Sequence, residues 1–355
     1  MAKRFGHLMV QITAFDNLWA AFRKAAKGKR SQPEVAAFEN DLMPNLVALQ
    51  EALQSGEWRP GVYRSFHIHE PKHRLISAAP FADRVVHHAL VRVIEPLFER
   101  TFIGDSYANR VGKGSHAALD RAQGWMRHYP FVLQCDIRQF FPQVDHQVLM
   151  GVLARKLACP ATLALCGHIL AGGEDGRSEP LFFPGDDLLA ATRSRGLPIG
   201  NLTSQFWANV LLNELDQFVK RELHWGPYLR YVDDFLLLGH DKAALWQARE
   251  AIVQKLAALR LALHTRSSTV AAAATGVPFL GFRLFAHYRR LKARNVKAFV
   301  RRQAVWRRAV ARGDMGLANV SVATAGWVAH ARHAHSLRLR SALLARPFRV
   351  GRACA

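Results

Sequence analysis

The sequence predicts an α+β fold in which an antiparallel sheet packs on helices, and three observations carry this prediction. Apolar residues recur at three- and four-residue spacings through much of residues 1–58. Short apolar runs at 131–136, 228–232 and 235–238 have the length and composition of buried strands. Half of the 355 residues are hydrophobic, which suffices for a substantial core divided among two or three packed subdomains.

The long segments show helical periodicity. A helical N-terminal region ends near residue 58, and a further helix is expected to be capped by Asn201 or Thr203. The same periodicity recurs in the ranges 83–100, 148–169 and 245–259 and in the basic tail. Residues 171–195 are rich in Gly, Asp and Pro, and a segment of this length indicates a functional or variable loop.

The strand-like segments come in pairs. Residues 63–68 and 74–77 flank Pro71 and predict a hairpin, and a second short pair surrounds residues 279–282. The runs 228–232 and 235–238 are separated only by Asp233 and Asp234, which predicts a hairpin with a tight acidic turn. Asp136 ends the strand-like run that begins at Phe131.

The charge is strongly positive and uneven. Lys and Arg number 49 against 27 Asp and Glu, which indicates a polyanionic partner, nucleic acid first of all. Residues 291–355 hold 14 of these cations and a single acid, Asp314. A generic solvated basic face is the alternative interpretation.

Composition also argues against several classes of protein. The four cysteines show neither CxxC nor zinc-finger spacing, so no disulfide framework or structural metal is indicated, and a reducing cytoplasm fits. No apolar run approaches the roughly 20 residues of a membrane span, and the N-terminus has no signal-peptide core. We therefore expect a cytoplasmic protein without a membrane partner.

The three aspartates suggest a site for divalent cations. Nucleotidyl transfer needs two such ions roughly 3.5–4 Å apart, and Mg²⁺ prefers oxygen ligands. Alone, an Asp-Asp pair is more often turn chemistry. Here, however, Asp233 and Asp234 lie between apolar strands, where carboxylates are costly unless cations neutralise them.

Tyr231-Val232-Asp233-Asp234 resembles the YxDD box of reverse transcriptases, and the segment 136–141 resembles the first catalytic motif of that family. The resemblance implies that Asp136, Asp233 and Asp234 are catalytic. It also implies that these aspartates and the Ile137 main-chain carbonyl bind two Mg²⁺ ions, with Mn²⁺ as a substitute. The implied architecture is a right-hand polymerase, divided into an N-terminal extension (1–60), fingers (61–130), palm (131–285, with a variable insertion at 170–195) and basic helical thumb (286–355).

The same resemblance implies contacts to dNTPs and primer. Phe141 falls at the steric-gate position that excludes a ribose 2′-hydroxyl, although a simple core aromatic is the alternative. Lys72 and Arg74 fall where the fingers hold a triphosphate, a task that suits the planar Arg fork; surface charge alone is the alternative for this pair. The implied dNTP contacts are Lys72, Arg74, Phe140, Phe141, Ile199, Gly200 and Gln205, and the implied primer grip is Phe279, Leu280, Gly281 and Phe282.

The segment from Leu197 to Gln205 is the most discriminating. Its Ile199-Gly200 and Ser204-Gln205 pairs resemble the polymerases of diversity-generating retroelements, as do the segments 83–90, 106–116 and 326–334. Ile199 places an alkyl group where most reverse transcriptases have an amide, so base selection should loosen. The resemblance implies error-prone copying of a template-repeat RNA, chiefly opposite adenines, for mutagenic retrohoming. It also implies a bacterial or phage-encoded enzyme with a small basic helical-bundle accessory protein.

The basic tail is expected to follow a phosphate backbone, with Phe299 and Trp306 between the cations. Lys113 in a glycine-flanked turn is a further candidate, though a solvated loop lysine is an equal alternative. The predicted nucleic-acid contacts are Lys113, Lys292, Arg294, Lys297, Arg301, Arg302, Arg307 and Arg308.

Two alternatives stay open. One is a phage-defence or other bacterial retroelement reverse transcriptase, which would share the palm and differ outside it. The other is a non-catalytic RNA-binding protein with a polymerase-like fold, which the three carboxylates and the aromatic at 141 disfavour.

Overall fold

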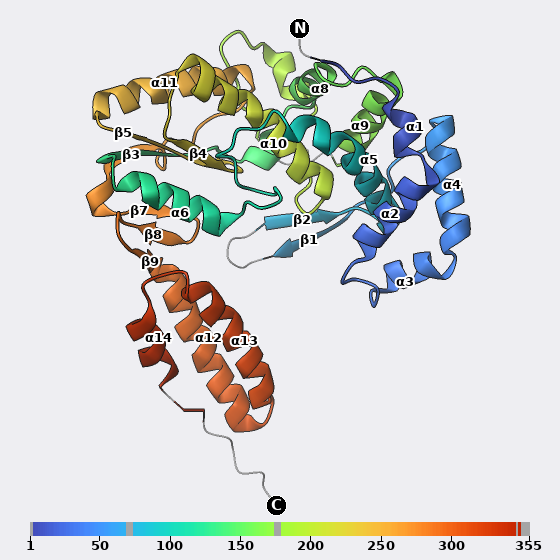
Figure 1. Ribbon diagram of the computed structural model, residues 1–355. Coiled ribbons are helices and arrows are strands. Elements are labelled where there is room, and N and C mark those ends of the chain that lie inside the picture. Colours follow the sequence, from blue (N-terminus) through green and yellow to red (C-terminus); the bar gives the residue numbers. More distant parts are fainter. Residues whose placement is uncertain (1–2, 69–73, 174–178, 346, 349–355) are drawn as a thin grey trace, which may run out of the picture.

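The computed structural model describes residues 3–68, 74–173, 179–345 and 347–348. It consists of helices around antiparallel sheets of two, four and three strands, which confirms the α+β prediction (Figure 1). The helical N-terminal region and the central four-stranded sheet lie at opposite ends of the main body, and the C-terminal helices project from the sheet end.

Of the four N-terminal helices, α1, α2 and α3 pack on one long central helix, α5 (Phe81–Glu99), and α4 packs on α2 and α3. Aromatic rings join them: the Phe22 ring is 6.0 Å from that of Phe38 and 6.1 Å from that of Phe81. Buried apolar residues on α2 confirm the predicted amphipathic stripe. The four helices are α1 (Leu8–Ile12), α2 (Phe15–Ala26), α3 (Pro33–Asn40) and α4 (Leu42–Ser55).

The predicted hairpin after this region is present. Strands β1 (Arg64–Ile68) and β2 (Arg74–Ala78) pair antiparallel, with Phe66 opposite Ile76. The connection between them, including Pro71 and the predicted triphosphate ligand Lys72, lies outside the described residues.

The four-stranded sheet has the order β4-β5-β3-β6, and all its neighbours are antiparallel. Side chains alternate between two cores: Leu133 and Leu237 face one, while Val132 and Leu238 face the other. Burial on both faces explains why these strands read as continuous apolar runs. The strands are β3 (Phe131–Asp136), β4 (Tyr228–Tyr231), β5 (Asp234–Gly239) and β6 (Thr269–Ala272).

Helices cover both faces of this sheet. α11 packs against β3, β5 and β6 on one face, and α6 packs against β4 and β5 on the other (Figure 1). Asp241 caps α11 by accepting hydrogen bonds from the backbone N–H groups of Ala243 and Ala244. The remaining elements here are α6 (Ser115–Met126), α7 (Phe140–Gln143), α8 (His146–Ala154), α9 (Pro160–Gly172), α10 (Leu202–Gln217), the π-helical turn η2 (Phe218–Glu222) and α11 (Lys242–Ala258).

Three sequence expectations need refinement. The helical stretch predicted for 148–169 divides into α8 and α9, because Pro160 disfavours a helical residue before it and starts a new helix. Asn201 precedes α10 as predicted, but its side chain forms no cap hydrogen bond to that helix; it bonds Ser77 and Ala79 instead. The acidic turn is formed by Val232 and Asp233, since Tyr231 pairs with Asp234 in the ladder.

Strand β6 was not expected from the sequence. It includes Ala271 and Ala272 from an alanine run, and alanine has little intrinsic preference for strands. Pairing with β3, where Val132 lies opposite Ala271, decides its conformation.

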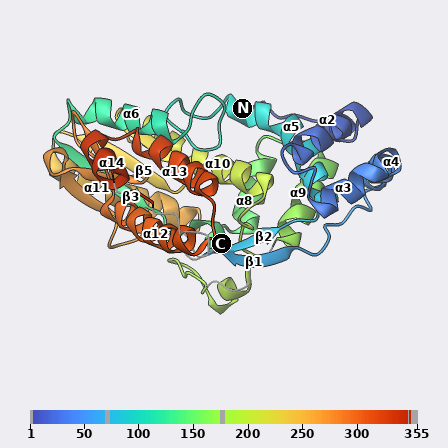
Figure 2. The ribbon, with the colours of Figure 1, turned by 90° about the horizontal axis from the view of Figure 1, so that it is seen from below.

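The chain then forms a three-stranded sheet and three helices, α12–α14, which we call the C-terminal helices. In Figure 2, which views the molecule from below, the C-terminal helices lie in front of the central sheet. The stacked rings of Phe299 and Trp327, 3.8 Å apart, join α12 to α13. The elements are β7 (Val277–Phe279), β8 (Phe282–Leu284), β9 (Arg289–Leu291), η3 (Ala273–Thr275), α12 (Ala293–Arg312), α13 (Leu317–Ala331) and α14 (Leu337–Leu344).

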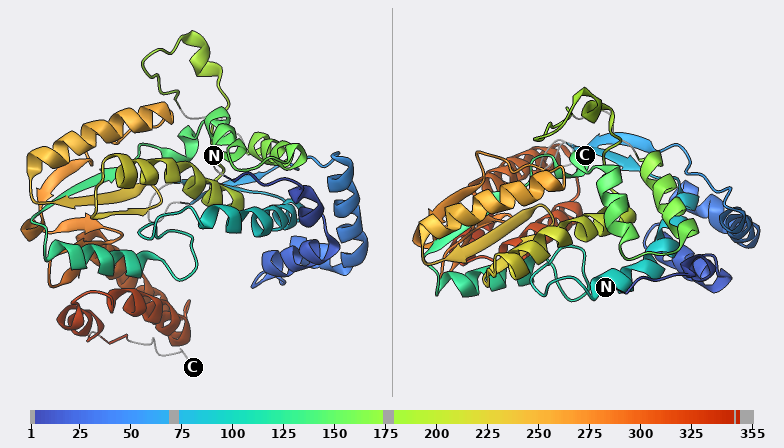
Figure 3. Two further views of the ribbon diagram at one scale, coloured as in Figure 1. Left: turned by 45° about the horizontal axis from the view of Figure 1, so that its top comes forward. Right: turned by 90° about the horizontal axis from the view of Figure 1, so that it is seen from above.

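Of the predicted irregular segment, residues 171 and 172 belong to α9, and residues 179–195 stand away from the body and contain one short 3₁₀ helix, η1 (Leu188–Thr192) (Figure 3). Its base is nonetheless anchored. Arg260 donates two hydrogen bonds of 2.7 Å to the Asp186 carboxylate and holds the pKa of that group at about 2. Among the described residues, no helix is long and apolar enough to cross a membrane.

Candidate active site

Three aspartates meet at one end of the central sheet. Asp136 is the last residue of β3 and lies directly opposite Asp234, the first residue of β5. Asp233 lies beside the end of β3, because its main-chain carbonyl accepts a 3.2 Å hydrogen bond from the backbone N–H of Ile137. The antiparallel register therefore brings together aspartate residues that lie far apart in the chain.

The turn that carries Asp233 is conformationally unusual. Val232 has φ of 54°, a left-handed conformation that β-branched residues rarely adopt. A tight two-residue hairpin requires positive φ at such a position, and glycine or asparagine usually supplies it. Backbone strain of this kind concentrates at functional sites.

The donor chemistry fits hard divalent cations, because carboxylate and main-chain carbonyl oxygens are the ligands that Mg²⁺ prefers. On the β3 side, the Asp136 carbonyl accepts a hydrogen bond of 2.7 Å from the His264 N–H, and Arg138 N–H bonds Ala262. In the part of the chain that is described, no group of three or more His, Cys, Asp or Glu side chains is gathered closely enough to hold a metal ion by itself. Any such ion would need phosphate or water oxygens to complete its coordination.

The hairpin β1–β2 is fastened to the segment that contains Ile199 and Gly200. Ser77 N–H donates to the Ile199 carbonyl at 3.1 Å, and the Asn201 side-chain amide donates to the Ser77 carbonyl at 2.9 Å. Gly200 has φ of 117°, and a Cβ there would come within 3.1 Å of Ile76. Arg74 is exposed at the start of β2. This strand therefore carries one predicted nucleotide contact, Arg74, and is hydrogen-bonded to the segment with two others, Ile199 and Gly200.

Gln205 is exposed on the first turns of α10. It borders a cavity of about 180 Å³. The cavity is also lined by Ala25, Lys29, Arg84, His87, His88, Gly200, Asn201 and Leu202.

Phe140 and Phe141 have different environments. Phe140 is 1% exposed and its ring packs in the hydrophobic core, while its expected contact with the nucleotide stays a prediction. Phe141 is half-buried, and its carbonyl accepts a 2.7 Å hydrogen bond from the Leu197 N–H. The predicted steric-gate residue is thereby tied to the segment that leads into Ile199.

The four residues of the predicted primer grip form a tight hairpin. Phe279 and Phe282 pair across β7 and β8, and both rings are buried. Leu280 and Gly281 form the turn with φ of 42° and 90°, so both turn residues have the positive φ of a type I′ turn. The Gly281 carbonyl accepts hydrogen bonds from Lys292 N–H and the Asn295 side chain, which places this turn against the start of α12.

A groove of about 690 Å³ runs between α12 and α13 from this turn. Arg294 and Arg302 line it together with Trp327 and His330. Two of the predicted nucleic-acid contacts therefore share one concave surface. Lys297, Arg301 and Arg308 are exposed elsewhere on α12, Lys292 precedes the helix, and the partly buried Arg307 packs over the Phe348 ring.

Lys113 is held by its own loop. Its ammonium donates a 2.6 Å hydrogen bond to the Gly104 carbonyl and lies 5.3 Å from the centre of the Tyr107 ring. These contacts favour a structural role over the predicted phosphate contact.

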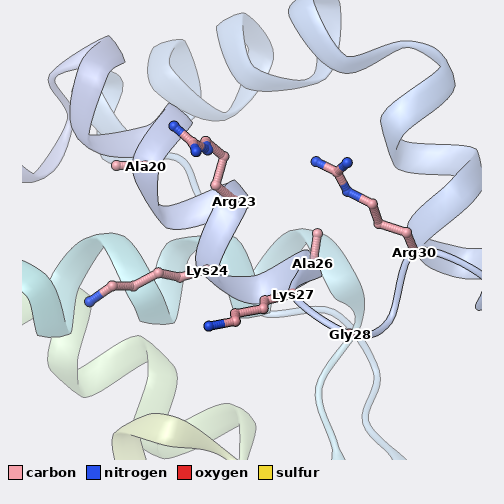
Figure 4. A pocket seen from close by; sticks show the side chains of 7 residues that line it. All are labelled: Ala20, Arg23, Lys24, Ala26, Lys27, Gly28 and Arg30. Atoms are coloured by element: carbon pink, nitrogen blue, oxygen red, sulfur yellow. The ribbon is translucent and has the colours of Figure 1, made fainter.

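Sequence reasoning missed a basic surface on the N-terminal helices. Four cations, Arg23, Lys24, Lys27 and Arg30, surround a concavity of about 600 Å³ at the end of α2 (Figure 4). All four are exposed, and Arg30 lies 3.3 Å from Glu39. The signal was present as the run Lys27-Gly28-Lys29-Arg30, but the larger excess in the tail obscured it.

Comparison with known proteins places this chain in a family. Residues 68–284 match the family described as "Reverse transcriptase (RNA-dependent DNA polymerase)". Because the match covers more than half of the chain and includes all three aspartates, the chain belongs to the reverse transcriptase family, a class of RNA-directed DNA polymerases.

The individual relatives share about a quarter of their residues with this chain over the matched ranges. Protein YkfC of Escherichia coli K12 is 25% identical over 284 residues, covering 68% of this chain and 72% of that protein. Group II intron-encoded protein LtrA of Lactococcus lactis subsp. cremoris is 23% identical over 216 residues, but the match spans only 33% of LtrA and 59% of this chain. Among solved structures, a C-terminally truncated apo telomerase from Candida tropicalis matches 70% of this chain and 60% of its own, with a TM-score of 0.46 and 10% identity.

Proposed function

We propose that this chain copies an RNA template into cDNA by two-metal nucleotidyl transfer at Asp136, Asp233 and Asp234. The observation that carries the proposal is the register that sets Asp136 opposite Asp234, with Asp233 hydrogen-bonded to the residue after Asp136. We divide the polymerase into fingers at residues 61–130, a palm at 131–285 and a thumb at 286–355.

In the proposed mechanism, the aspartates and the Ile137 carbonyl would hold two Mg²⁺ ions, for which Mn²⁺ substitutes. When bound, the pair supplies activation of the primer 3′-hydroxyl and charge neutralisation at the triphosphate. Arg74 would orient the triphosphate, for which its planar fork is suited. Phe141 would pack against the sugar and exclude a 2′-hydroxyl.

The primer and template would follow the basic surfaces. The Leu280–Gly281 turn lies against α12, and the groove with Arg294 and Arg302 continues from it. We assign the primer-template duplex to this groove, where exposed arginines would contact phosphates. The basic concavity around Arg23 and Arg30 is a second candidate surface for RNA.

Primer extension on an RNA template with Mg²⁺ tests the chemistry. Asp233→Asn and Asp234→Asn should each lower the rate by on the order of 10³-fold, because a neutral amide holds a divalent ion poorly. Asp241→Asn is the matched control: it makes the same change at an exposed helix cap near the same sheet, where Asn caps as well as Asp. Undiminished extension by either active-site variant would refute the assignment.

We further propose the diversity-generating subclass for this enzyme, with error-prone copying of a template-repeat RNA and a small basic accessory protein. Its support is the alkyl side chain of Ile199, half-buried where its carbonyl fastens the segment to β2. An error spectrum of the wild type and Ile199→Gln on one RNA template tests this. We expect fewer errors opposite adenine in the variant, and equal spectra would remove the proposed cause.

A different biological role has one observation in its favour. LtrA is named as a group II intron-encoded protein, so another bacterial retroelement, including one used in phage defence, is the second candidate. A template repeat and a variable-repeat gene beside the coding sequence would favour diversification. An isolated locus with a toxin-like effector would favour defence.

A further inference from the structure

Arg230 is a buried cation directly beneath the turn that carries Asp233. It lies on β4, and its side chain, like that of Asp216 on α10, is 0% exposed. Nε and Nη2 of Arg230 donate to the two oxygens of Asp216 at 2.8 and 2.6 Å. This two-pronged geometry compensates for the burial of both charges and fixes the plane of the guanidinium.

The remaining donors of Arg230 are also used. Nη2 donates to the Ser106 hydroxyl at 3.2 Å, while Nη1 donates to the Asn209 side-chain carbonyl at 3.2 Å and to the Val232 main-chain carbonyl at 3.1 Å. The N–H donors of an arginine form a rigid fork, and each nitrogen of this fork has a partner here. The guanidinium therefore has one orientation, set by its partners.

The bond to Val232 reaches the strained residue itself. Val232 has φ of 54°, and the next two residues are Asp233 and Asp234. A valine does not hold this conformation by intrinsic preference, so the surrounding structure must impose it. Among the described hydrogen bonds, the one from Arg230 is the side-chain contact that holds the Val232 carbonyl.

The same network connects the turn to α10. Asn209 and Asp216 both lie on this helix, which begins just after Gly200, and Asp216 also accepts a 2.7 Å hydrogen bond from the Tyr228 hydroxyl. Burial, reinforced by the Asp216 charge, raises the pKa of Tyr228 well above its usual value, so the hydroxyl remains a donor. The segment with Ile199 and Gly200 thus leads directly into α10, and the same helix supplies the residues that hold Arg230 beneath the turn.

We propose that Arg230 is a positioning residue of the active site: held by Asp216 and Asn209, its guanidinium fixes the Val232 carbonyl and so sets where Asp233 and Asp234 present their carboxylates. The inference rests on the proposed function for its catalytic consequence. It concerns a residue that contacts neither substrate nor metal.

The first experiment removes the network without leaving a buried charge. In the double variant Arg230→Met/Asp216→Leu both ions are replaced by apolar residues, Met close to Arg in volume and Leu larger than Asp, and buried pairs commonly tolerate apolar replacement. We expect a folded protein whose kcat for primer extension falls about 100-fold, since small displacements of catalytic groups have effects of this order. The Mg²⁺ concentration for half-maximal rate should rise, while KM for dNTP should stay close to the wild-type value.

Arg110→Met/Glu99→Leu is the matched control. Arg110 also forms an ion pair with a carboxylate and bonds the Ser106 carbonyl, and in the described hydrogen bonds it contacts neither Arg230 nor the turn itself. The control variant Arg110→Met/Glu99→Leu should leave kcat and the Mg²⁺ requirement close to those of the wild type. A folded Arg230→Met/Asp216→Leu protein with the wild-type kcat and Mg²⁺ requirement would overturn the proposal.

A second variant covers the case in which the double variant does not fold. Arg230→Lys keeps the charge but loses the planar fork, so it should lower kcat on its own. Glycine adopts positive φ without strain, so adding Val232→Gly should restore at least part of the loss. If Arg230→Lys had the same effect with and without Val232→Gly, a role exerted through this turn would be contradicted.

Hydrogen–deuterium exchange separates this inference from the proposed function. In Arg230→Lys, exchange should rise by roughly tenfold in the peptide spanning residues 228–238 and remain unchanged in the peptide spanning 277–291, because only the first contains the turn that loses its support. This readout needs no polymerase activity. Unchanged exchange in both peptides would overturn the positioning role, whereas a wild type without primer extension would refute only the proposed function.

Discussion

Two tight hairpin turns near the proposed active site are stabilised in different ways. The Val232–Asp233 turn has a β-branched residue at positive φ and is fixed from below by the buried Arg230. The Leu280–Gly281 turn includes a glycine and is anchored by the buried rings of Phe279 and Phe282. The difference teaches that the turn presenting charges is supported by a buried side chain beneath it, whereas the turn offering only backbone is anchored by its flanking rings and by hydrogen bonds to its Gly281 carbonyl.

The largest effect expected from this comparison is on stability. Phe279→Ala should lower the free energy of unfolding by about 3–5 kcal/mol, because it removes a fully buried ring and leaves a cavity. Urea denaturation measures the change. Tyr231→Phe, a conservative change beside the other turn, should cost less than about 1 kcal/mol. A similar small loss for Phe279→Ala would show that packing does not anchor the second hairpin.

The next effect contrasts the two turns at their backbones. Gly281→Ala should destabilise the fold by about 1–2 kcal/mol, because φ of 90° strains any residue with a Cβ. Val232→Gly should change stability by less than about 1 kcal/mol, since relief of strain offsets the greater freedom of the unfolded chain. Thermal and urea unfolding of both variants test the pair, and the reverse ranking would contradict our account of the strain.

A smaller effect concerns the groove beside the second turn. Arg302→Gln should reduce the slope of log affinity against log salt by about one for an RNA–DNA duplex, because one phosphate contact is lost. Arg312→Gln is the control, since Arg312 ends α12 and pairs with Asp314. Fluorescence anisotropy at several salt concentrations measures both slopes. Identical slopes would place the duplex outside this groove.

The smallest effect is a pH dependence confined to the second turn. Partial burial, with His333 nearby, lowers the pKa of His330, whose ring lies 4.8 Å from that of Phe282. The charges facing this region include His116, Arg289 and Asp120.

Because the folded-state pKa of His330 lies below its unfolded value of about 6.5, its full contribution to stability is present above that pH and is lost as pH falls. His330→Phe should flatten the decline in unfolding free energy between about pH 7.5 and about pH 5.5. An unchanged slope would show that His330 does not contribute.

Much of the architecture could be predicted from local patterns. Helical periodicity and apolar runs located α2, α5, α11, β3 and the β4–β5 hairpin, because burial on one stripe or on both sheet faces leaves a direct trace in sequence. The strand β6 left no such trace, since its alanines fit a strand only through pairing with β3. The same limit applies to Asn201, whose side chain bonds β2 rather than capping α10.

The sequence by itself determined the chemistry of the candidate site: an aspartate at the end of one strand, an Asp-Asp pair between two others, an aromatic residue at 141 and a basic tail. Family membership follows from the match of residues 68–284, which contain the three aspartates and Phe141, and needs no tertiary structure. Only the tertiary structure decided that Asp136 faces Asp234, that Phe140 packs in the core while Phe141 is half-buried, and that Arg230 supports the turn. These facts depend on register and burial, which are set by contacts between segments far apart in the chain and therefore leave no local pattern.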